Sequence, residues 1–373
     1  MKRLARRGPV RPWLIGVAIL ALLLTACGGA AEEAEPAGDA DTDGAPSASA
    51  PSAEEAAEPV TVRFAPTAPL PIYWPYYYVA DALGFYEEEN IDVEFVNAQT
   101  AVQQALLAGR LDVSGTGLDY IPQAPTFDDP PKWYMNVDKY LWLMVTLADS
   151  EFRTAQDLEG GRIGINEPHD TLDADFLMGA AGVPQGEYEL IPVGQDRAAL
   201  VALERGEIDA FVTAGAVSVA ALKDFTDSDL RVIENPVAED YYNTGNMVTL
   251  DRLENERDVA VRFGRAVAKG MIWTWENPQA TGELVYEMIP ESAESAEQAV
   301  ELVEAGNEAN RASYEDRGRM DLEIYQDMVD THAEVGLIDE SYDASILFTN
   351  DLIDDIWDFD VEAEIEAARN DER

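Results

Sequence analysis

From residue 60 onward, the apolar positions switch between a period of two and a helical period, which predicts alternating strands and helices. Residues 60–64 and 91–96 alternate apolar with polar side chains, as strands with one buried face do. Helical spacing follows up to residue 83 and again over 101–108, and the third strand is expected at 111–113. This rhythm predicts an α/β fold with an open, mainly parallel sheet.

The unit that ends in the third strand recurs later in the chain. Residues 105–116 read ALLAGRLDVSGT, and residues 202–213 read ALERGEIDAFVT. Each copy runs from a helix through a glycine cap into a strand, so we predict two lobes of related construction. Ligands of open α/β sheets bind beyond the carboxyl ends of the strands, which is where Thr116 and Thr213 fall.

Two apolar segments are expected to carry the chain between the lobes, over 139–148 and back over 243–250. The first lobe would then comprise 60–148 and a largely helical return at 244–373, and the second lobe 149–243. A body of this length exceeds what one hydrophobic core usually serves, which also favours two lobes.

The N-terminus has the pattern of a secretory signal. Five basic residues precede an apolar run at 13–24, which is too short to span about 30 Å of hydrocarbon as a stable helix. The run ends in Leu-Thr-Ala-Cys-Gly, which resembles the lipobox of bacterial lipoproteins and implies cleavage before Cys27 and lipidation of its sulfur. The alternative is an ordinary signal peptide with a chance cysteine.

We therefore expect a signal peptide at 1–26 and, from the lipidated Cys27, a disordered acidic tether at 27–59. Residues 28–59 contain no aromatic and no basic residue and show no apolar periodicity, so they cannot bury enough surface to become ordered. This arrangement predicts an extracytoplasmic protein, anchored by lipid alone to the outer face of a bacterial cell membrane.

Charge and cysteine content narrow the partners. The formal net charge is −48, and removing the five basic residues of the signal makes it −53, which excludes nucleic acid or anionic headgroups as partners of a broad surface. Cys27 is the only cysteine, so the monomer has neither a disulfide nor a thiolate metal cluster. We expect a monomer without cofactor or metal.

Residues 71–78 read Pro-Ile-Tyr-Trp-Pro-Tyr-Tyr-Tyr, an expected loop with five aromatic rings between a strand and a helix. We predict that Trp74, Tyr76 and Tyr77 form the stacking wall of a ligand pocket, while Tyr78 belongs to the core. Tyr73 is left open. The alternative is that the rings only close the end of a sheet.

Several stretches together resemble one family, the substrate-binding lipoproteins of ABC importers related to thiamine-precursor and alkanesulfonate binders. The matching stretches, in family order, are YYVADALGFYE at 77–87, IDVEF at 91–95, ALLAGRLD at 105–112, DLEGGRIG at 157–164 and ENP at 276–278. The resemblance implies a type II periplasmic-binding-protein fold, with two Rossmann-like α/β lobes joined by two crossover strands. It also implies that the lobes close on a small molecule and deliver it to an ABC permease driven by a cytoplasmic ATPase.

Family positions map onto polar and aromatic residues of this chain. The resemblance places the ligand site at Trp74, Tyr76, Tyr77, Thr116, Asp119, Asp170, Thr171, Thr213, Asn243 and Asn246. For Thr116 and Thr213 the alternative is a local turn or cap, for Thr171 a helix N-cap, and for the two aspartates a solvated side chain.

These positions carry no Arg or Lys, and Asp119 and Asp170 lie among them, so an anion would be disfavoured. We expect a neutral or cationic heteroaromatic ligand, such as an aminopyrimidine thiamine precursor. Alternatives within the family are ligands of the alkanesulfonate, taurine or nitrate type and of the riboflavin type. An enzyme of related fold that makes the thiamine pyrimidine is disfavoured, because only His169 lies near the expected cleft and no other cysteine is present.

Overall fold

The computed structural model describes the chain in seven stretches, 58–66, 72–98, 102–139, 142–166, 170–194, 196–234 and 241–371. The predicted signal peptide, Cys27 and the predicted tether up to residue 57 lie outside these residues, as does Pro71 at the start of the aromatic stretch. None of the described helices is both long enough and apolar enough to cross a membrane.

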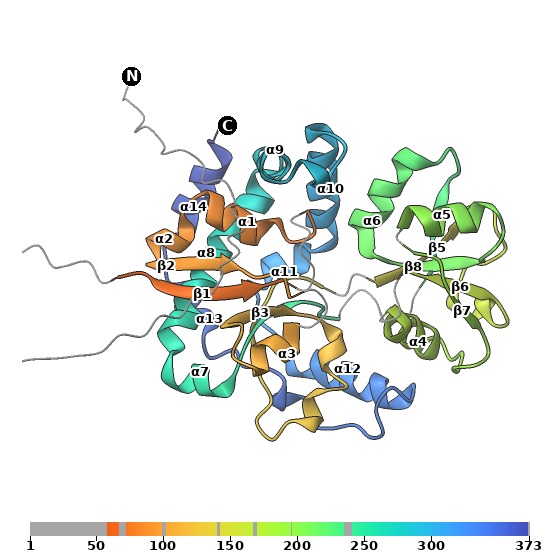
Figure 1. Cartoon of the computed structure of the whole chain (residues 1–373), viewed down its shortest axis with the longest axis horizontal. Helices are drawn as coiled ribbons and strands as arrows, with labels where there is room; N and C mark the ends of the chain where they lie inside the picture. Colours follow the sequence, from red (N-terminus) through yellow and green to blue (C-terminus); the bar gives the residue numbers. More distant parts are fainter. Residues whose placement is uncertain are drawn as a thin grey trace, which may run out of the picture. The chain divides into compact units, whose positions relative to one another are not determined.

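The first of two five-stranded sheets has the order β2-β1-β3-β10-β4 (Figure 1). Its strands are β1 Val60–Ala65, β2 Ile91–Phe95, β3 Val113–Thr116, β4 Lys132–Asn136 and β10 Gly245–Val248. β1 pairs in parallel with β2 and β3, whereas β10 runs antiparallel to both β3 and β4. The three strands predicted for this part of the chain are therefore present, with the third beginning two residues later than predicted.

The second sheet repeats this plan in the order β7-β6-β8-β5-β9. Its strands are β5 Trp142–Leu147, β6 Arg162–Ile165, β7 Glu189–Pro192, β8 Ala210–Ala214 and β9 Leu230–Val232. β6 pairs in parallel with β7 and β8, and β5 runs antiparallel to β8 and β9. In each sheet, one strand follows the segment in which the chain crosses from the other sheet. This strand, β10 in the first sheet and β5 in the second, runs antiparallel to both of its neighbours.

The expected α/β class and its two sheets are thus present. Below, the first lobe means β1–β4, β10 and the helices that pack on them, and the second lobe means β5–β9 with their helices. β5 lies in the second sheet, earlier in the chain than residue 149, and the exact lobe boundaries at 148 and 243 stay predictions.

The helices alternate with strands before residue 222 and follow one another after residue 250. The first group is α1 Pro75–Ala82, α2 Phe85–Glu88, α3 Val102–Leu107, α4 Thr171–Ala180, α5 Asp196–Glu204 and α6 Gly215–Leu222. The second group is α7 Leu250–Asn255, α8 Arg257–Glu276, α9 Pro278–Met288, α10 Ala296–Ala309, α11 Arg311–Glu315, α12 Leu322–Glu334, α13 Ile353–Ile356 and α14 Val361–Arg369. Short 3-10 turns are η1 Leu118–Tyr120, η2 Ala124–Thr126, η3 Ala155–Leu158, η5 Lys223–Phe225, η6 Pro290–Ser292 and η7 Ala344–Ile346.

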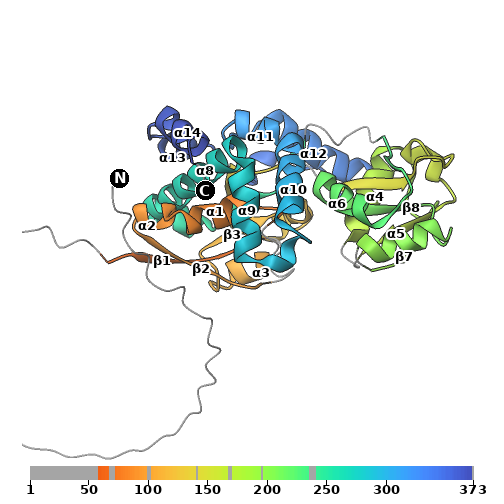
Figure 2. The same ribbon diagram turned by 90° about the horizontal axis from the view of Figure 1, so that it is seen from above.

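Part of the aromatic stretch is helical, which corrects the expected loop. Pro75 occupies the first position of α1, where its missing N–H costs nothing, and its fixed φ favours helix. The helix packs closely on α8, because a Cβ at Gly270 would collide with the carbonyl oxygen of Tyr76 (Figures 1 and 2). The tyrosines at 76, 77 and 78 therefore lie on a helix and are buried.

Candidate functional site

The two repeated threonines both lie at the carboxyl end of their strands, fully buried, and their hydroxyls have different partners. The Thr116 hydroxyl hydrogen-bonds to that of Ser114 at 2.9 Å. The Thr213 hydroxyl instead donates to Asp196 Oδ1 at 2.9 Å, an oxygen that also accepts from Asn166 Nδ2 at 3.1 Å. In the second lobe, the carboxylate of Asp196 therefore lies beside the end of β8.

The aromatic residues divide between the site and the core. Tyr77 is fully buried, its ring lies against Phe64, and its hydroxyl donates to Asn246 Oδ1 at 2.7 Å. Tyr78, expected in the core, stacks on Phe95. The Tyr77 hydroxyl thus bonds to Asn246, whose Nδ2 donates to Met135 Sδ at 3.8 Å, within the core of the first lobe.

The other three aromatic residues, Trp74, Tyr76 and Tyr73, differ in the partners of their polar atoms. Trp74 Nε1 donates to Asp138 Oδ2 at 3.0 Å. The buried Tyr76 hydroxyl has no hydrogen-bond partner among the described residues. Tyr73, which the sequence left open, forms a 2.6 Å hydroxyl contact with Ser218 of α6 in the second lobe. Tyr73 therefore joins the two lobes directly.

Asp138 follows β4 at the crossover and was not predicted. Its carboxylate accepts from Trp74 and from the backbone N–H of Thr244, and the Asn243 side chain also hydrogen-bonds to it. Burial raises the pKa of Asp138 to about 7, although these hydrogen bonds act to lower it. Asp138 thus connects the aromatic stretch to both crossovers.

Carboxylates from the two lobes meet near the strand ends. Asp119 lies in η1 after β3, exposed, and accepts from Gln103 Nε2 at 2.7 Å. Asp170 is buried at the start of α4, and its carboxylate accepts from the backbone N–H of Asn166 at 3.0 Å. Burial, followed by the negative charges of Asp170 and Asp119, raises the pKa of Asp173 well above its usual value. Negative charge from both lobes therefore converges on Asp173.

The remaining predicted residues border this group. Thr171 is half-buried in the first turn of α4, and Asp170, not Thr171, occupies the N-cap position. Asn243 is half-buried, and a Cβ at Gly117 would lie 3.8 Å from its Oδ1 and 3.6 Å from Asp119 Oδ1. Asn243 and Asp119 therefore flank the same glycine.

The structure thus brings Trp74, Asn243, Asp119, Asp170 and Thr171 to the strand ends, together with the unpredicted Asp138, Asp173 and Asp196. A usable signal for Asp138 was its position directly after an apolar strand. Whether any of these residues contacts a ligand stays a prediction. No three His, Cys, Asp or Glu side chains in the described stretches are arranged to hold a metal ion.

Solved structures share this fold at low identity. A protein from Bordetella bronchiseptica RB50 matches with TM-score 0.60 and 16% identity over 84% of this chain and 99% of that one. A putative periplasmic sulfonate-binding protein, SsuA, of an ABC transporter from Methylobacillus flagellatus KT matches with TM-score 0.59 and 16% identity over 83% and 96%. The desulfurization enzyme DszB matches with TM-score 0.55 and 13% identity over 80% and 98%.

These likenesses confirm the periplasmic-binding-protein fold. A search of curated proteins gives no match. A family model described as NMT1/THI5 like matches residues 73–281, more than half of the chain, which includes the second sheet and the first sheet except β1. The chain belongs to the NMT1/THI5-like family.

Proposed function

We propose that this protein is an extracytoplasmic solute-binding protein that captures a small heteroaromatic ligand between its two lobes. The family and the fold support a binding protein, and the ligand would lie where the strand ends of both sheets carry polar side chains. The ligand would then pass to an ABC permease coupled to a cytoplasmic ATPase. The chain would act as a monomer held at the membrane's outer face by lipid on Cys27.

The observation that carries the ligand class is the convergence of Asp119, Asp170 and Asp173. A sulfonate or nitrate placed there would add negative charge beside Asp119 and Asp170, which is costly in a partly desolvated site. An exocyclic amine could instead donate hydrogen bonds to these carboxylates, and a protonated ring nitrogen would be attracted to their negative charge. Trp74, 8% exposed, supplies a ring on which a heteroaromatic ligand can stack. An aminopyrimidine of the thiamine-precursor type satisfies both requirements.

Catalysis is disfavoured even though DszB, an enzyme, shares the fold. His169, the histidine near the expected cleft, lies outside the described residues. His332 is buried in α12, its Nδ1 lies 2.6 Å from the Met328 carbonyl oxygen, and burial lowers its pKa to about 4. The single cysteine of the chain is expected to carry the lipid. We therefore propose binding without chemistry on this chain.

Thermal unfolding of the purified body against a ligand panel tests this proposal. Aminopyrimidines should raise the melting temperature by mass action, with flavins as the second aromatic class and alkanesulfonates, taurine and nitrate as the anionic classes. If only the anionic compounds stabilise the protein, the proposed ligand class is wrong. If a compound is converted to product during incubation, the protein is an enzyme.

Substitution of Trp74 by Ala should weaken aminopyrimidine binding about tenfold, the value of one lost stacking contact. Trp275→Ala is the matched control, because Trp275 stacks on Tyr314 away from the proposed residues. Calorimetric titration of both variants measures the difference, and circular dichroism confirms that both are folded. Equal affinity in the wild type and Trp74→Ala would remove this ring from the site.

A further inference from the structure

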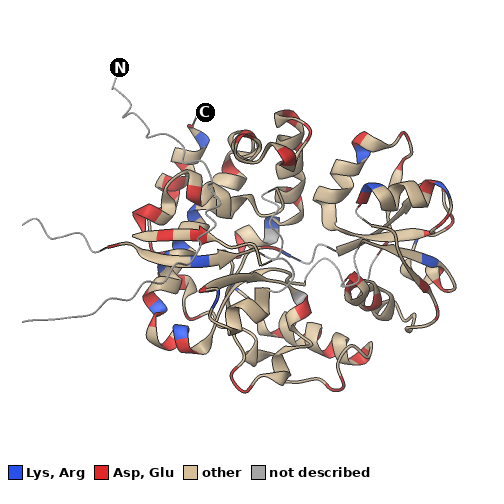
Figure 3. Cartoon of the chain, viewed as in Figure 1, with Lys and Arg blue, Asp and Glu red and all other residues tan. Residues whose placement is uncertain are grey.

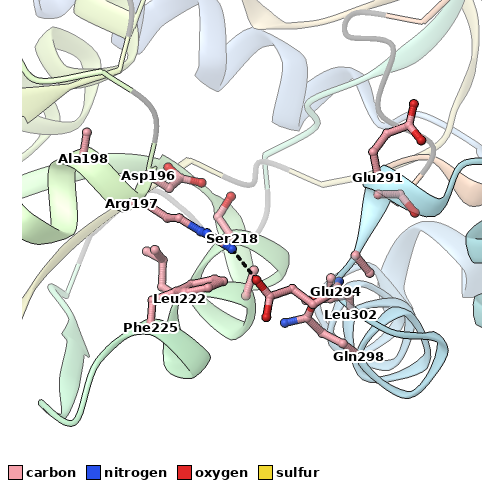
Figure 4. A pocket seen from close by; sticks show the side chains of 13 residues that line it. Asp196, Arg197, Ala198, Ser218, Leu222, Phe225, Glu291, Glu294, Gln298 and Leu302 are labelled. Carbon is pink, nitrogen blue, oxygen red and sulfur yellow. Dashed lines mark hydrogen bonds and ion pairs between the residues drawn. The ribbon is translucent and has the colours of Figure 1, made fainter.

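A cavity of about 610 Å³ lies beside the predicted site, between the second lobe and α10 (Figure 4). Its lining comprises Asp196, Arg197, Ala198, Ser218, Ala221, Leu222, Phe225, Glu291, Ser292, Ala293, Glu294, Gln298 and Leu302. A space of this size accommodates a small organic molecule. Asp196 connects the lining to a predicted site residue, through its hydrogen bond from Thr213.

The charge of the lining favours a cation. Three carboxylates, from Asp196, Glu291 and Glu294, face one basic side chain, Arg197. That guanidinium is already engaged, because it pairs with Glu294 at 2.6 Å and lies 3.3 Å from the centre of the Phe225 ring. The negative charges of Asp196 and Glu291 therefore have no basic partner within this lining. Asp196 Oδ1 accepts from the neutral donors Thr213 and Asn166, and no described residue forms a hydrogen bond or ion pair with Glu291.

Contacts across the cavity hold its two walls together. Gln298 of α10 donates to Asp224 of η5 and accepts from the backbone N–H of Glu294. Val217 of α6 and Leu302 of α10 share one apolar cluster, and the two helices lie side by side in Figure 2. An occupant of this cavity would therefore touch both lobes.

We propose that this cavity binds a small organic monocation whose ammonium group lies near Asp196 and Glu291 and whose apolar body lies against Leu222 and Leu302. The lining combines net negative charge with the apolar surface that such a molecule needs. Since both walls contribute, the bound cation stabilises the arrangement in which α6 and α10 are in contact. This site goes beyond the proposed solute function and does not depend on the identity of that solute.

Three probes of similar size and different charge test the site on the intact body. Benzylamine should raise the melting temperature, whereas its neutral counterpart benzyl alcohol and the anion benzenesulfonate should not. Equal stabilisation by benzylamine and benzyl alcohol would overturn the requirement for a cation. Absence of stabilisation by benzylamine would overturn the site.

Two variants locate the probe. Glu291→Gln should weaken benzylamine about fivefold, the effect of one partly exposed charge pair, and Ala221→Leu should reduce binding further by filling the cavity. Glu301→Gln is the matched control, because Glu301 is exposed on α10 outside the lining. If benzylamine binds both cavity variants as it binds the wild type, this inference fails. Aminopyrimidine binding that depends on Trp74 would then still support the proposed function.

Discussion

The two lobes contain the same corner, built from an arginine on a central strand and an aspartate after a glycine-capped helix. Asp112 accepts from the backbone N–H of Arg63 at 2.8 Å and from two nitrogens of its guanidinium. Asp209 accepts from the backbone N–H of Arg162, also at 2.8 Å, and from the corresponding guanidinium nitrogens. The repeat in the sequence is therefore a repeat of hydrogen bonds, and it fixes strand to helix in each lobe.

The two corners differ in the additional ion pairs and hydrogen bonds that their side chains form. Arg252 of α7 forms a second ion pair with Asp112, whose side chain is 6% exposed, whereas that of Asp209 is 19% exposed. In the second lobe Arg162 instead donates its remaining nitrogen to the carbonyl oxygens of Gly206 and Glu207. α7, whose ribbon carries both basic and acidic positions in Figure 3, thus reinforces the corner of the first lobe, while the second lobe satisfies its corner with its own chain.

The largest expected difference between the lobes is in the cost of removing each aspartate. Asp112→Ala should lower the free energy of unfolding by about 3 kcal/mol, because two arginines lose a buried partner. Asp209→Ala should cost about 1 kcal/mol, because its arginine is more exposed and keeps two carbonyl partners. Urea unfolding at neutral pH measures both.

The pH dependence provides a control for this comparison. Burial acts to raise the pKa of both aspartates, but the hydrogen bonds from their arginines outweigh it and hold both pKa values below normal. Their stabilisation is therefore present at neutral pH and is lost as the pH falls through the folded-state values. The two variants should converge with the wild type in acid. Equal costs at neutral pH would show that Arg252 adds nothing.

The two lobes also differ in a carboxylate on α1 and one on α4, the helices that follow the equivalent strands β1 and β6. Asp81 of α1 has no hydrogen-bond donor among the described residues, and burial, then Glu87 and Asp92, raises its pKa to about 6. Asp175 of α4 accepts from the Tyr188 hydroxyl and from Gln185. Burial also raises the pKa of Asp175, although its two donors act to lower it. Asp81 therefore destabilises the fold at neutral pH without a compensating donor, whereas Asp175 keeps two hydrogen bonds that would be lost or weakened on substitution.

Asp81→Asn should make the protein more stable by about 1 to 2 kcal/mol at pH 8, allowing for partial solvent screening. Because the folded state binds the proton more tightly, wild-type stability falls as the pH rises from about 4 to about 6, and the amide avoids this loss. Asp175→Asn should instead cost about 1 kcal/mol, because one donor loses its acceptor. Urea titrations at pH 4 and pH 8 separate the effects. A gain for Asp81→Asn that is as large at pH 4 would exclude ionisation as its cause.

Much of the fold could be predicted from the sequence because it depends on local pattern. The alternation at β1 and β2 and the repeated helix–glycine–strand unit predict elements without knowledge of their neighbours. The site was less accessible because its contacts are distant in sequence. Asp138 acquires its role from Trp74 and Thr244, which lie 64 and 106 residues away.

Tyr77 also shows why local sequence could not predict the site residues. Its aromatic ring suits a pocket or a core equally well, and no local pattern distinguishes the two environments. The core position follows from the packing of α8 on α1, where Gly270 allows close approach to the backbone of Tyr76. Composition at the predicted positions, which carry carboxylates without Arg or Lys, indicates a neutral or cationic ligand, and this stays a prediction.

The smallest expected effect, and the one in which the lobes should agree, is at the glycine caps. Gly109 and Gly206 have φ of +66° and +67°, and no atom lies within 4 Å of a Cβ placed on either. Alanine at either position should therefore cost about 1 kcal/mol from the left-handed backbone alone, without steric clash. Urea unfolding of the two single variants should give matching losses. If Gly109→Ala costs clearly more than Gly206→Ala, the helices that pack on the first lobe stabilise the backbone at Gly109 as well as the side chain of Asp112.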